Sequence, residues 1–218
     1  MKIINHLTKI YGEENKPFLI YQNTELKFSD IINEQQINLD IVNPGDVVAL
    51  IGDFNASSIS TLLRLIDLKT IIVPLTIDTK NMHKYFFESA LVDVVIKDGK
   101  TKYLNHNNTH KLIENLRQKS HAGLILFSTG TTGRPKAILH DMTLFLERFQ
   151  TPRPTLKIIN FLLFDHIGGI NTLLHTIFNS GVVVAPIDRD VDSILKICAK
   201  YKVEVLPTTP TFLRLMLL

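Results

Sequence analysis

The sequence predicts an α/β protein in which strands and helices alternate and form largely parallel sheets. Short apolar runs rich in β-branched residues alternate with segments whose apolar residues recur at the helical spacing of three and four positions. The alternation continues along most of the 218 residues. This order is typical of parallel sheets covered by helices. Ligands in such sheets bind at the carboxyl ends of the strands, so functional residues are expected there.

Each predicted element follows from its own local pattern. Apolar, β-branched runs predict strands at Asp46–Ile51, Thr70–Val73, Val92–Ile96, Leu124–Phe127, Ala137–His140, Ile158–Phe164, Val182–Ala185 and Val203–Leu206. Helical periodicity predicts helices at Ser57–Leu68, Lys80–Ala90, Lys111–Lys119, Met142–Phe149, Ile167–Asn179 and Val191–Tyr201, and one beginning after Pro210. The polar segment Asp98–Asn108 predicts a surface loop or a short hairpin.

Composition excludes several classes of protein. Hydrophobic residues make up 45% and charged residues 21% of the chain, ordinary values for a globular protein with a sizeable core. The net charge of +3, without a basic run, argues against a nucleic-acid partner. The single cysteine, Cys198, excludes a disulfide framework within one chain. We find no secretory signal and no apolar run of membrane-spanning length, and therefore expect a cytoplasmic protein without a membrane span.

The most informative stretch is LILFSTGTTGRPKAILH, at residues 124–140. Its apolar beginning predicts a buried strand, which stops at a segment of serine, threonine and glycine followed by arginine, proline and lysine. Glycine lets backbone N–H groups approach an anion, hydroxyls add donors, and Lys136 and Arg134 add positive charge. Such a loop at the end of a strand is suited to holding a polyphosphate.

Two generic phosphate-binding motifs do not fit this stretch. The Walker loop needs a Gly-Lys-Ser/Thr ending that opens a helix, but Gly133 is followed by Arg-Pro-Lys and an apolar triplet. That order predicts a chain that leaves the loop extended. The dinucleotide fingerprint fails as well, because only two glycines are present and a strand follows.

The stretch closely resembles the phosphate-loop signature of the adenylate-forming, or AMP-binding, superfamily, Thr/Ser-Ser-Gly-Thr-Thr-Gly-x-Pro-Lys-Gly. That superfamily contains acyl- and aryl-CoA synthetases, adenylation domains of peptide synthetases, and luciferases. Ser128 to Lys136 match it with Thr129 where serine is usual, and Ala137 then stands where glycine is usual. Neither departure removes a phosphate donor. The alternative, a Thr/Gly-rich turn without function, would require these ordered positions to agree by accident.

Weaker likenesses to the superfamily extend over nearly the whole chain. Residues 43–76 resemble its early strand–helix–strand, residues 84–96 the following helix and strand, residues 161–186 the acid-pocket segment, and residues 200–217 the helix–strand–helix after it. The region 30–43 departs from the family, which has a longer first helix there.

The resemblance also implies how the chain is divided and what it lacks. Residues 1–120 are expected to form the first α/β lobe, and residues 121–218 the lobe with the phosphate loop and the acid pocket. The family's adenine contacts, hinge and C-terminal catalytic lysine all lie further along its sequence. We therefore interpret the chain as the N-terminal portion of an acyl-CoA-synthetase-like enzyme, cut inside the second lobe, whose C-terminal part is a required partner.

The implied reaction is the activation of a small carboxylic acid by an AMP-forming ligase. The carboxylate attacks the α-phosphate of ATP, forming an acyl-adenylate and pyrophosphate, and the acyl group then passes to the thiol of CoA or of a carrier phosphopantetheine. The resemblance assigns the β- and γ-phosphates to Ser128, Thr129, Gly130, Thr131, Thr132, Gly133 and Lys136. Thr132, or else Thr131, is expected to approach Mg²⁺ with its hydroxyl. Arg134 stands at the family's variable position and is expected to be a solvated cation.

A second candidate site is the acid pocket around Asp165 and His166. Ligases of the family often carry an aromatic-His pair here, which implies that His166 is catalytic and lies beside the substrate carboxylate. Peptide-synthetase domains often carry Phe-Asp instead, which would make Asp165 the partner of an amino group. The spacing from His166 to Gly181 favours the ligase alignment, and a structural turn is the third reading. Gly168 and Gly169 would let the backbone approach a ligand, or let a helix start against the sheet.

Three functions remain open on the sequence. The first is the AMP-forming carboxylate ligase, with an amino-acid or carrier-protein adenylating enzyme as its variant. The second is a phosphotransferase or NTPase with an unusual loop, which would release ADP rather than pyrophosphate. The third is a nucleotide-binding but inactive relative, which follows if the catalytic half is absent. In any of these cases the 218 residues alone are expected to be inactive in adenylation.

Overall fold

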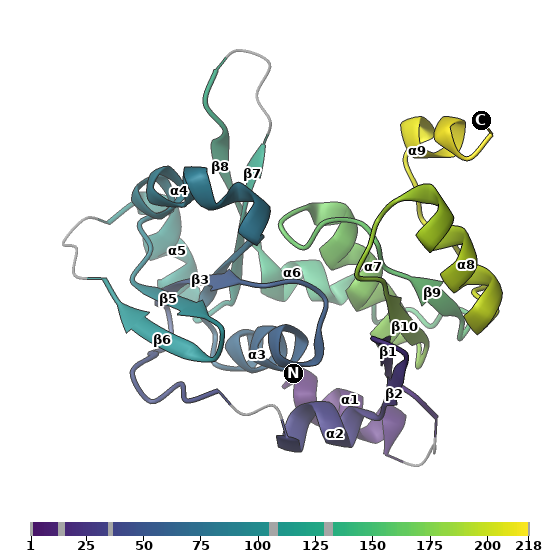
Figure 1. Ribbon diagram of the computed structural model, residues 1–218. Coiled ribbons are helices and arrows are strands. Elements are labelled where there is room, and N and C mark those ends of the chain that lie inside the picture. Colours follow the sequence, from purple (N-terminus) through teal and green to yellow (C-terminus); the bar gives the residue numbers. More distant parts are fainter. Residues whose placement is uncertain (1, 13–15, 35–36, 105–108, 129–132, 218) are drawn as a thin grey trace.

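The computed structural model describes residues 2–12, 16–34, 37–104, 109–128 and 133–217. Within these residues, six strands form one sheet in the order β6-β5-β3-β4-β7-β8, and four strands form a second sheet in the order β2-β1-β10-β9 (Figure 1). Neighbouring strands inside both sheets are parallel, and antiparallel pairing occurs only where β2, β6 and β8 form edges. This arrangement confirms the predicted α/β class.

The strands are β1 (Leu19–Tyr21), β2 (Thr24–Leu26), β3 (Val47–Ile51), β4 (Ile71–Leu75), β5 (Val94–Lys97), β6 (Lys100–Tyr103), β7 (Gly123–Ser128), β8 (Lys136–Asp141), β9 (Lys157–Ile159) and β10 (Val182–Ala185). The helices are α1 (Ile3–Tyr11), α2 (Phe28–Glu34), α3 (Ala56–Asp67), the 3₁₀ helix η1 (Ile77–Met82), α4 (His83–Ala90), α5 (Lys111–Lys119), α6 (Met142–Glu147), α7 (Ile167–Phe178), α8 (Val191–Tyr201) and α9 (Pro210–Leu215).

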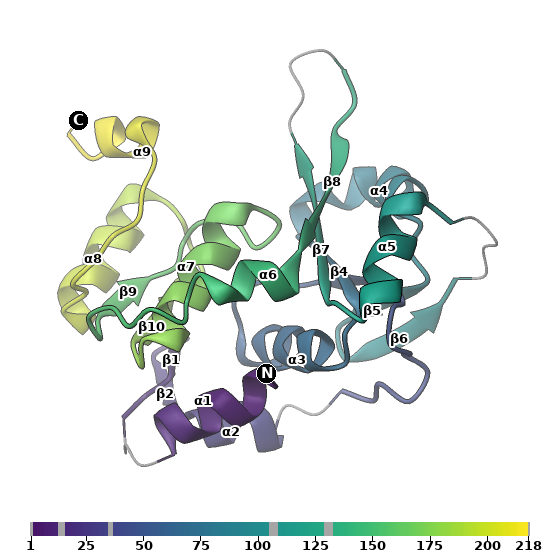
Figure 2. The same cartoon turned by 180° about the vertical axis from the view of Figure 1, so that it is seen from behind.

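Helices cover the larger sheet on both faces, and its central strands are apolar at every position. Val48 and Leu50 of β3 pack in the core that contains α3, whereas their neighbours Val47 and Ala49 pack with α4 and α5 on the opposite face. Alternate side chains of a strand point to opposite faces, so a strand covered twice must be apolar throughout. Figures 1 and 2 show α3 on one side of this sheet and α4 and α5 on the other.

The smaller sheet shares its inner core with the larger one. Leu19 and Val183 belong to the same apolar cluster as α1, α3 and α7, which lies between the two sheets. On the outer face, Ile20 and Val184 pack against Ile194 of α8. The two sheets are therefore joined through a common core (Figure 2).

Two predicted strands are wrong in extent. The strand predicted at Ile158–Phe164 ends at Ile159, because the chain then leaves the sheet and buries Phe164 against Phe54, with ring centroids 5.1 Å apart. The strand predicted at Val203–Leu206 is reduced to a single bridge between Val205 and Ile158. Pro207, which has no N–H group to donate, follows it directly.

The other predicted elements are present with small changes at their ends. The helix predicted at Lys80–Ala90 is divided into η1 and α4. Of the two structures predicted for the polar segment 98–108, its described beginning forms the hairpin, turning at Asp98 and Gly99, both of which have positive φ. Residues 105–108 lie outside the described residues. No element is predicted before residue 46, although Ile3, Leu7 and Tyr11, the buried residues of α1, recur at helical spacing.

The division into lobes at residues 120 and 121 stays a prediction. The hydrogen-bonded sheets group the chain differently, since β7 and β8 pair with the sheet of residues 47–103, and β1 and β2 pair with the sheet that contains β9 and β10. Among the described residues, no helix is both long enough and apolar enough to cross a membrane.

Candidate functional site

The phosphate-loop signature lies on the hairpin of β7 and β8. The two strands pair antiparallel from Gly123 opposite Asp141 to Ser128 opposite Lys136. The chain therefore leaves the loop in an extended strand, as its Pro-Lys exit predicts. Outside the described residues lie Thr129, Gly130, Thr131 and Thr132. Their contacts with phosphate, and that of Thr132 with Mg²⁺, stay predictions.

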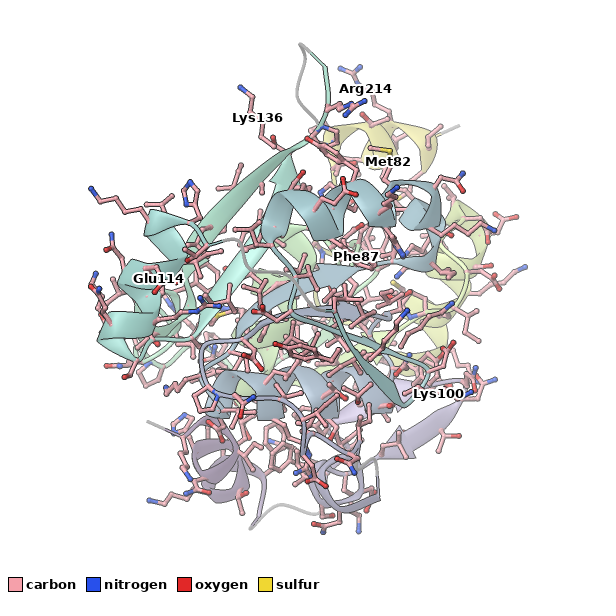
Figure 3. All side chains as sticks on the ribbon, turned by 90° about the vertical axis from the view of Figure 1, so that its left-hand side faces the viewer. Met82, Phe87, Lys100, Glu114, Lys136 and Arg214 are labelled. Atoms are coloured by element: carbon pink, nitrogen blue, oxygen red, sulfur yellow. The ribbon has the colours of Figure 1, made fainter. Side chains whose placement is uncertain are left out.

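Gly133 stands at the described end of the loop. It has φ +144°, a conformation that favours glycine, and no atom of the described residues lies within 4 Å of the position that a Cβ atom would take. Lys136 is exposed, and its side chain projects outward from the hairpin (Figure 3). The exposed Lys136 ammonium group thus supplies positive charge close to this turn.

Helix α4 holds the exit of this turn. The Tyr85 hydroxyl donates a hydrogen bond of 2.8 Å to the carbonyl oxygen of Pro135. The Arg134 guanidinium lies over the Tyr85 ring, 5.5 Å from its centroid. Arg134 is exposed and also contacts this aromatic ring, so the solvated cation that the sequence predicts has one neighbour in the structure.

Asp165 and His166 lie in the turn that enters α7. Asp165 Oδ2 accepts a hydrogen bond of 3.2 Å from Thr76 Oγ1, whereas Oδ1 is buried without a hydrogen-bond partner among the described residues. His166 Nε2 lies 3.9 Å from Asp165 Oδ1. The imidazole is 49% exposed and the aspartate side chain only 11%. The histidine is therefore the member of the pair that a solute can reach.

Close packing explains why glycine is required at one of the two glycine positions beside this pair. A Cβ atom on Gly169 would lie 2.2 Å from the Leu163 carbonyl oxygen and 2.9 Å from Phe54 Cζ, so the first turn of α7 packs where only glycine fits. A Cβ atom on Gly168 would meet only the side-chain end of Leu162, at 3.1 Å. A ligand contact at either glycine stays a prediction.

The base of the phosphate-loop hairpin and the turn before α7 lie at the same edge of the larger sheet. Thr76 directly follows β4, Ser128 ends β7, and β4 and β7 are parallel neighbours. Their carboxyl ends therefore lie at the same edge, where ligands of parallel sheets bind. The hydrogen bond between Thr76 and Asp165 brings the turn before α7 to this edge.

An ion pair at the carboxyl ends of β3 and β10 was missed by the sequence analysis. Arg189 Nη2 lies 2.7 Å from both carboxylate oxygens of Asp53, and Arg189 Nε donates to the Phe161 carbonyl oxygen at 2.8 Å. Three chain segments are tied together by this one guanidinium. Asp53 and Arg189 are 136 positions apart, and neither stands in a local motif that would have revealed the pairing.

The comparison with known families decides the assignment. The sequence pattern of the AMP-binding enzymes matches residues 42–218, which is most of the chain. The chain belongs to the AMP-binding enzyme family. The match confirms the relationship that the phosphate-loop signature implies. No curated protein matches the sequence significantly.

Solved structures of AMP-binding enzymes share the fold. The o-succinylbenzoate CoA synthetase (MenE) of Bacillus subtilis, in complex with the acyl-adenylate intermediate OSB-AMP, superposes with a TM-score of 0.72 at 15% identity, covering 98% of this chain and 63% of that one. The N-terminal subdomain of NpsA of Klebsiella oxytoca, in complex with 3-hydroxyanthranilyl-AMSN, gives a TM-score of 0.73 at 16% identity over 94% of this chain and 59% of that one.

A third similar structure is the luciferase-like enzyme of the nonluminescent mealworm Zophobas morio, with a TM-score of 0.71 and 17% identity over 99% of this chain and 60% of that one. The chain thus spans about three fifths of the length of these proteins. At such identities the likeness establishes the fold, which is that of the N-terminal domain of AMP-binding enzymes.

Proposed function

We propose that the chain is the phosphate- and acid-binding portion of an AMP-forming carboxylate ligase. The observation that carries the proposal is that two groups lie at one sheet edge: the base of the phosphate-loop hairpin, where Ser128 pairs with Lys136, and the Asp165–His166 turn, which Thr76 ties to that edge. Membership in the AMP-binding enzyme family supports it.

The reaction forms one bond to phosphorus and breaks another. A carboxylate oxygen of the acid attacks the α-phosphorus of ATP, the bond from that phosphorus to its bridging oxygen breaks, and pyrophosphate leaves. Negative charge builds on the departing phosphates, so the Lys136 ammonium and the backbone N–H groups near Gly133 stabilise the transition state. Mg²⁺, when bound, would neutralise part of the phosphate charge. The hydroxyls assigned to it lie outside the described residues.

His166 is proposed as the group beside the acid. Its half-exposed imidazole stands at the N-cap position of α7, where the positive end of the helix dipole also favours an anion. The imidazole would lie beside the substrate carboxylate, with Asp165 Oδ1 3.9 Å from its Nε2 on the inner side. The acid is thereby held near the turn that binds the phosphates.

The geometry favours this reading over amino-acid recognition by Asp165. The carboxylate has one oxygen engaged by Thr76 and the other buried, and its side chain is only 11% exposed, so it offers little surface to an incoming ammonium group. Reaching it would require the turn to open. Acceptance of the acyl group by CoA or by a carrier phosphopantetheine is part of the proposal, as is a cytoplasmic setting with Cys198 reduced.

The test is carboxylate-dependent exchange of pyrophosphate into ATP. We would measure it with the 218-residue chain and with longer gene products that contain it, against fatty, aryl and amino acids. Exchange with fatty or aryl acids in a longer product, and none in the chain alone, supports the proposal. Release of ADP would indicate a phosphotransferase. ATP binding without exchange by any product would indicate a relative that only binds nucleotide.

A further inference from the structure

Helix α4 contacts both halves of the proposed site, and nothing in the proposed chemistry uses it. From this helix, Tyr85 donates to the carbonyl oxygen of Pro135 at 2.8 Å and places its ring beneath Arg134. These two contacts hold the described end of the phosphate loop. Figure 3 looks onto this face of the molecule, with Lys136 projecting from the hairpin above α4.

His83, at the start of the same helix, contacts Thr76, which binds the Asp165–His166 turn. Its Nε2 lies 2.9 Å from the Thr76 carbonyl oxygen, and since a carbonyl oxygen can only accept, Nε2 carries the hydrogen. The Thr79 hydroxyl donates to the same carbonyl oxygen at 3.0 Å. Thr76 in turn donates its side-chain hydroxyl to Asp165. His83 is 9% exposed, so this is a buried bond rather than a surface contact.

The helix that carries these two residues is fixed to the sheet. Phe86 is buried and stacks on Phe127 of β7, with ring centroids 4.1 Å apart. Phe127 directly precedes Ser128, where the phosphate loop begins. Ala90 is also buried in the same apolar cluster. Because α4 is anchored next to the base of the hairpin, a displacement of the helix would move both hydrogen bonds together.

We propose that Tyr85 and His83 are positioning residues, and that α4 sets the spacing between the phosphate-binding turn and the acid-binding turn. Tyr85 acts on the first through Pro135, and His83 acts on the second through Thr76 and Asp165. The role of α4 in the reaction rests on the proposed function, whereas the two contacts can be tested without it. In-line attack requires the two reactants to lie within a fraction of an ångström of the productive geometry. Contacts that fix the spacing between the two turns would therefore favour the reaction.

The first experiment compares Tyr85→Phe with Tyr103→Phe in the 218-residue chain. Both variants remove one phenolic oxygen, but Tyr103 is an exposed residue of β6 on another part of the sheet. We expect Tyr85→Phe to speed amide hydrogen exchange at residues 133–137 by about three- to tenfold, the effect of one lost hydrogen bond, with exchange in α3 unchanged. The affinity for ATP, the probe ligand, measured in a longer product that contains the chain, should fall by a similar factor. Tyr103→Phe should change neither quantity.

The second experiment compares His83→Leu with His83→Gln. Leucine removes the donor to Thr76, whereas glutamine keeps an N–H group and should restore the bond. We expect His83→Leu to speed hydrogen exchange at residues 165–167 by about three- to tenfold and to leave ATP affinity within about twofold, with His83→Gln close to the unmodified chain. If His83 only stabilised the fold, its loss would not affect the acid-binding turn while leaving the phosphate-binding turn unchanged.

The outcomes separate this inference from the proposed function. Tyr85→Phe indistinguishable from Tyr103→Phe in both exchange and ATP affinity would overturn the role of Tyr85. Equal effects of His83→Leu on both turns would overturn the role of His83. If longer products that contain the chain fail to bind ATP, the proposed function fails, while the exchange measurements on the chain still decide whether α4 holds the two turns. If His83→Leu does not fold, His83→Gln and Thr76→Val take its place, with faster exchange expected for Thr76→Val only.

Discussion

Arg189 and Asp53 join the two sheets across their carboxyl ends. One guanidinium nitrogen of Arg189 lies 2.7 Å from each oxygen of the Asp53 carboxylate, while Nε of the same group donates to the Phe161 carbonyl oxygen. The side chains are 26% and 41% exposed, so solvent screens the pair in part. The backbone hydrogen bond adds a contact that an ordinary surface ion pair lacks.

We predict that Arg189→Met lowers the free energy of unfolding by about 1–2 kcal/mol, since it removes both the ion pair and the bond to Phe161. Asp53→Asn should cost less, because the bond to Phe161 survives. Denaturant unfolding of both variants and of the double variant measures their coupling. Equal costs for the two single variants would contradict the role given to the backbone contact.

Lys136→Ala should reduce the rate of pyrophosphate formation by more than about tenfold in a longer, active product, corresponding to about 1.4 kcal/mol or more of lost transition-state stabilisation. Lys100→Ala is the matched control, since Lys100 is an equally exposed lysine on β6, away from the hairpin (Figure 3). Steady-state exchange assays compare the two. Similar rates for both variants would remove Lys136 from the phosphate site.

Gly169→Ala should destabilise the protein by about 1–3 kcal/mol, because the new methyl group would overlap the backbone oxygen of Leu163, which cannot shift without moving the chain. Gly168→Ala meets only a flexible side-chain end and should cost less than about 1 kcal/mol. The free energies of unfolding of the two variants give the comparison. A larger cost at Gly168 would show that the start of α7 is packed differently.

Acidification should destabilise the protein through two half-buried histidines. Burial lowers the pKa of His140, and burial followed by the nearby Lys9 lowers the pKa of His6. Folding therefore favours the neutral imidazoles, and the unfolded chain binds more protons once the pH falls below about 6.5. The corresponding stability is present above that pH and is lost as the pH falls through the folded-state pKa values.

Thermal unfolding at about pH 7.5 and about pH 5.5 measures this effect. We expect a lower melting temperature at the acidic pH, and a smaller difference between the two in His140→Gln, which removes one of the groups. An undiminished difference in that variant would assign the acid sensitivity to other residues.

Local patterns in the sequence determined the fold class and the phosphate-loop hairpin. An apolar run followed by hydroxyls, glycine and Pro-Lys predicts a buried strand, a loop and an extended return, because each of those features depends on neighbouring residues alone. The strand pairing of Ser128 with Lys136 confirms this. Helical periodicity likewise located α3, α5, α7 and α8 to within a few residues of their ends.

Tertiary structure alone decided what surrounds those motifs. Thr76 reaches Asp165 across 89 positions, and Tyr85 reaches Pro135 across 50, and neither pairing leaves a periodic or compositional signal. No local signal shows that the segment from Val203 does not continue as a strand. Nor does one show that the chain after Ile159 leaves the sheet and buries Phe164. Strands and loops form from local preference, but which loop meets which depends on how the shared core packs the two sheets together.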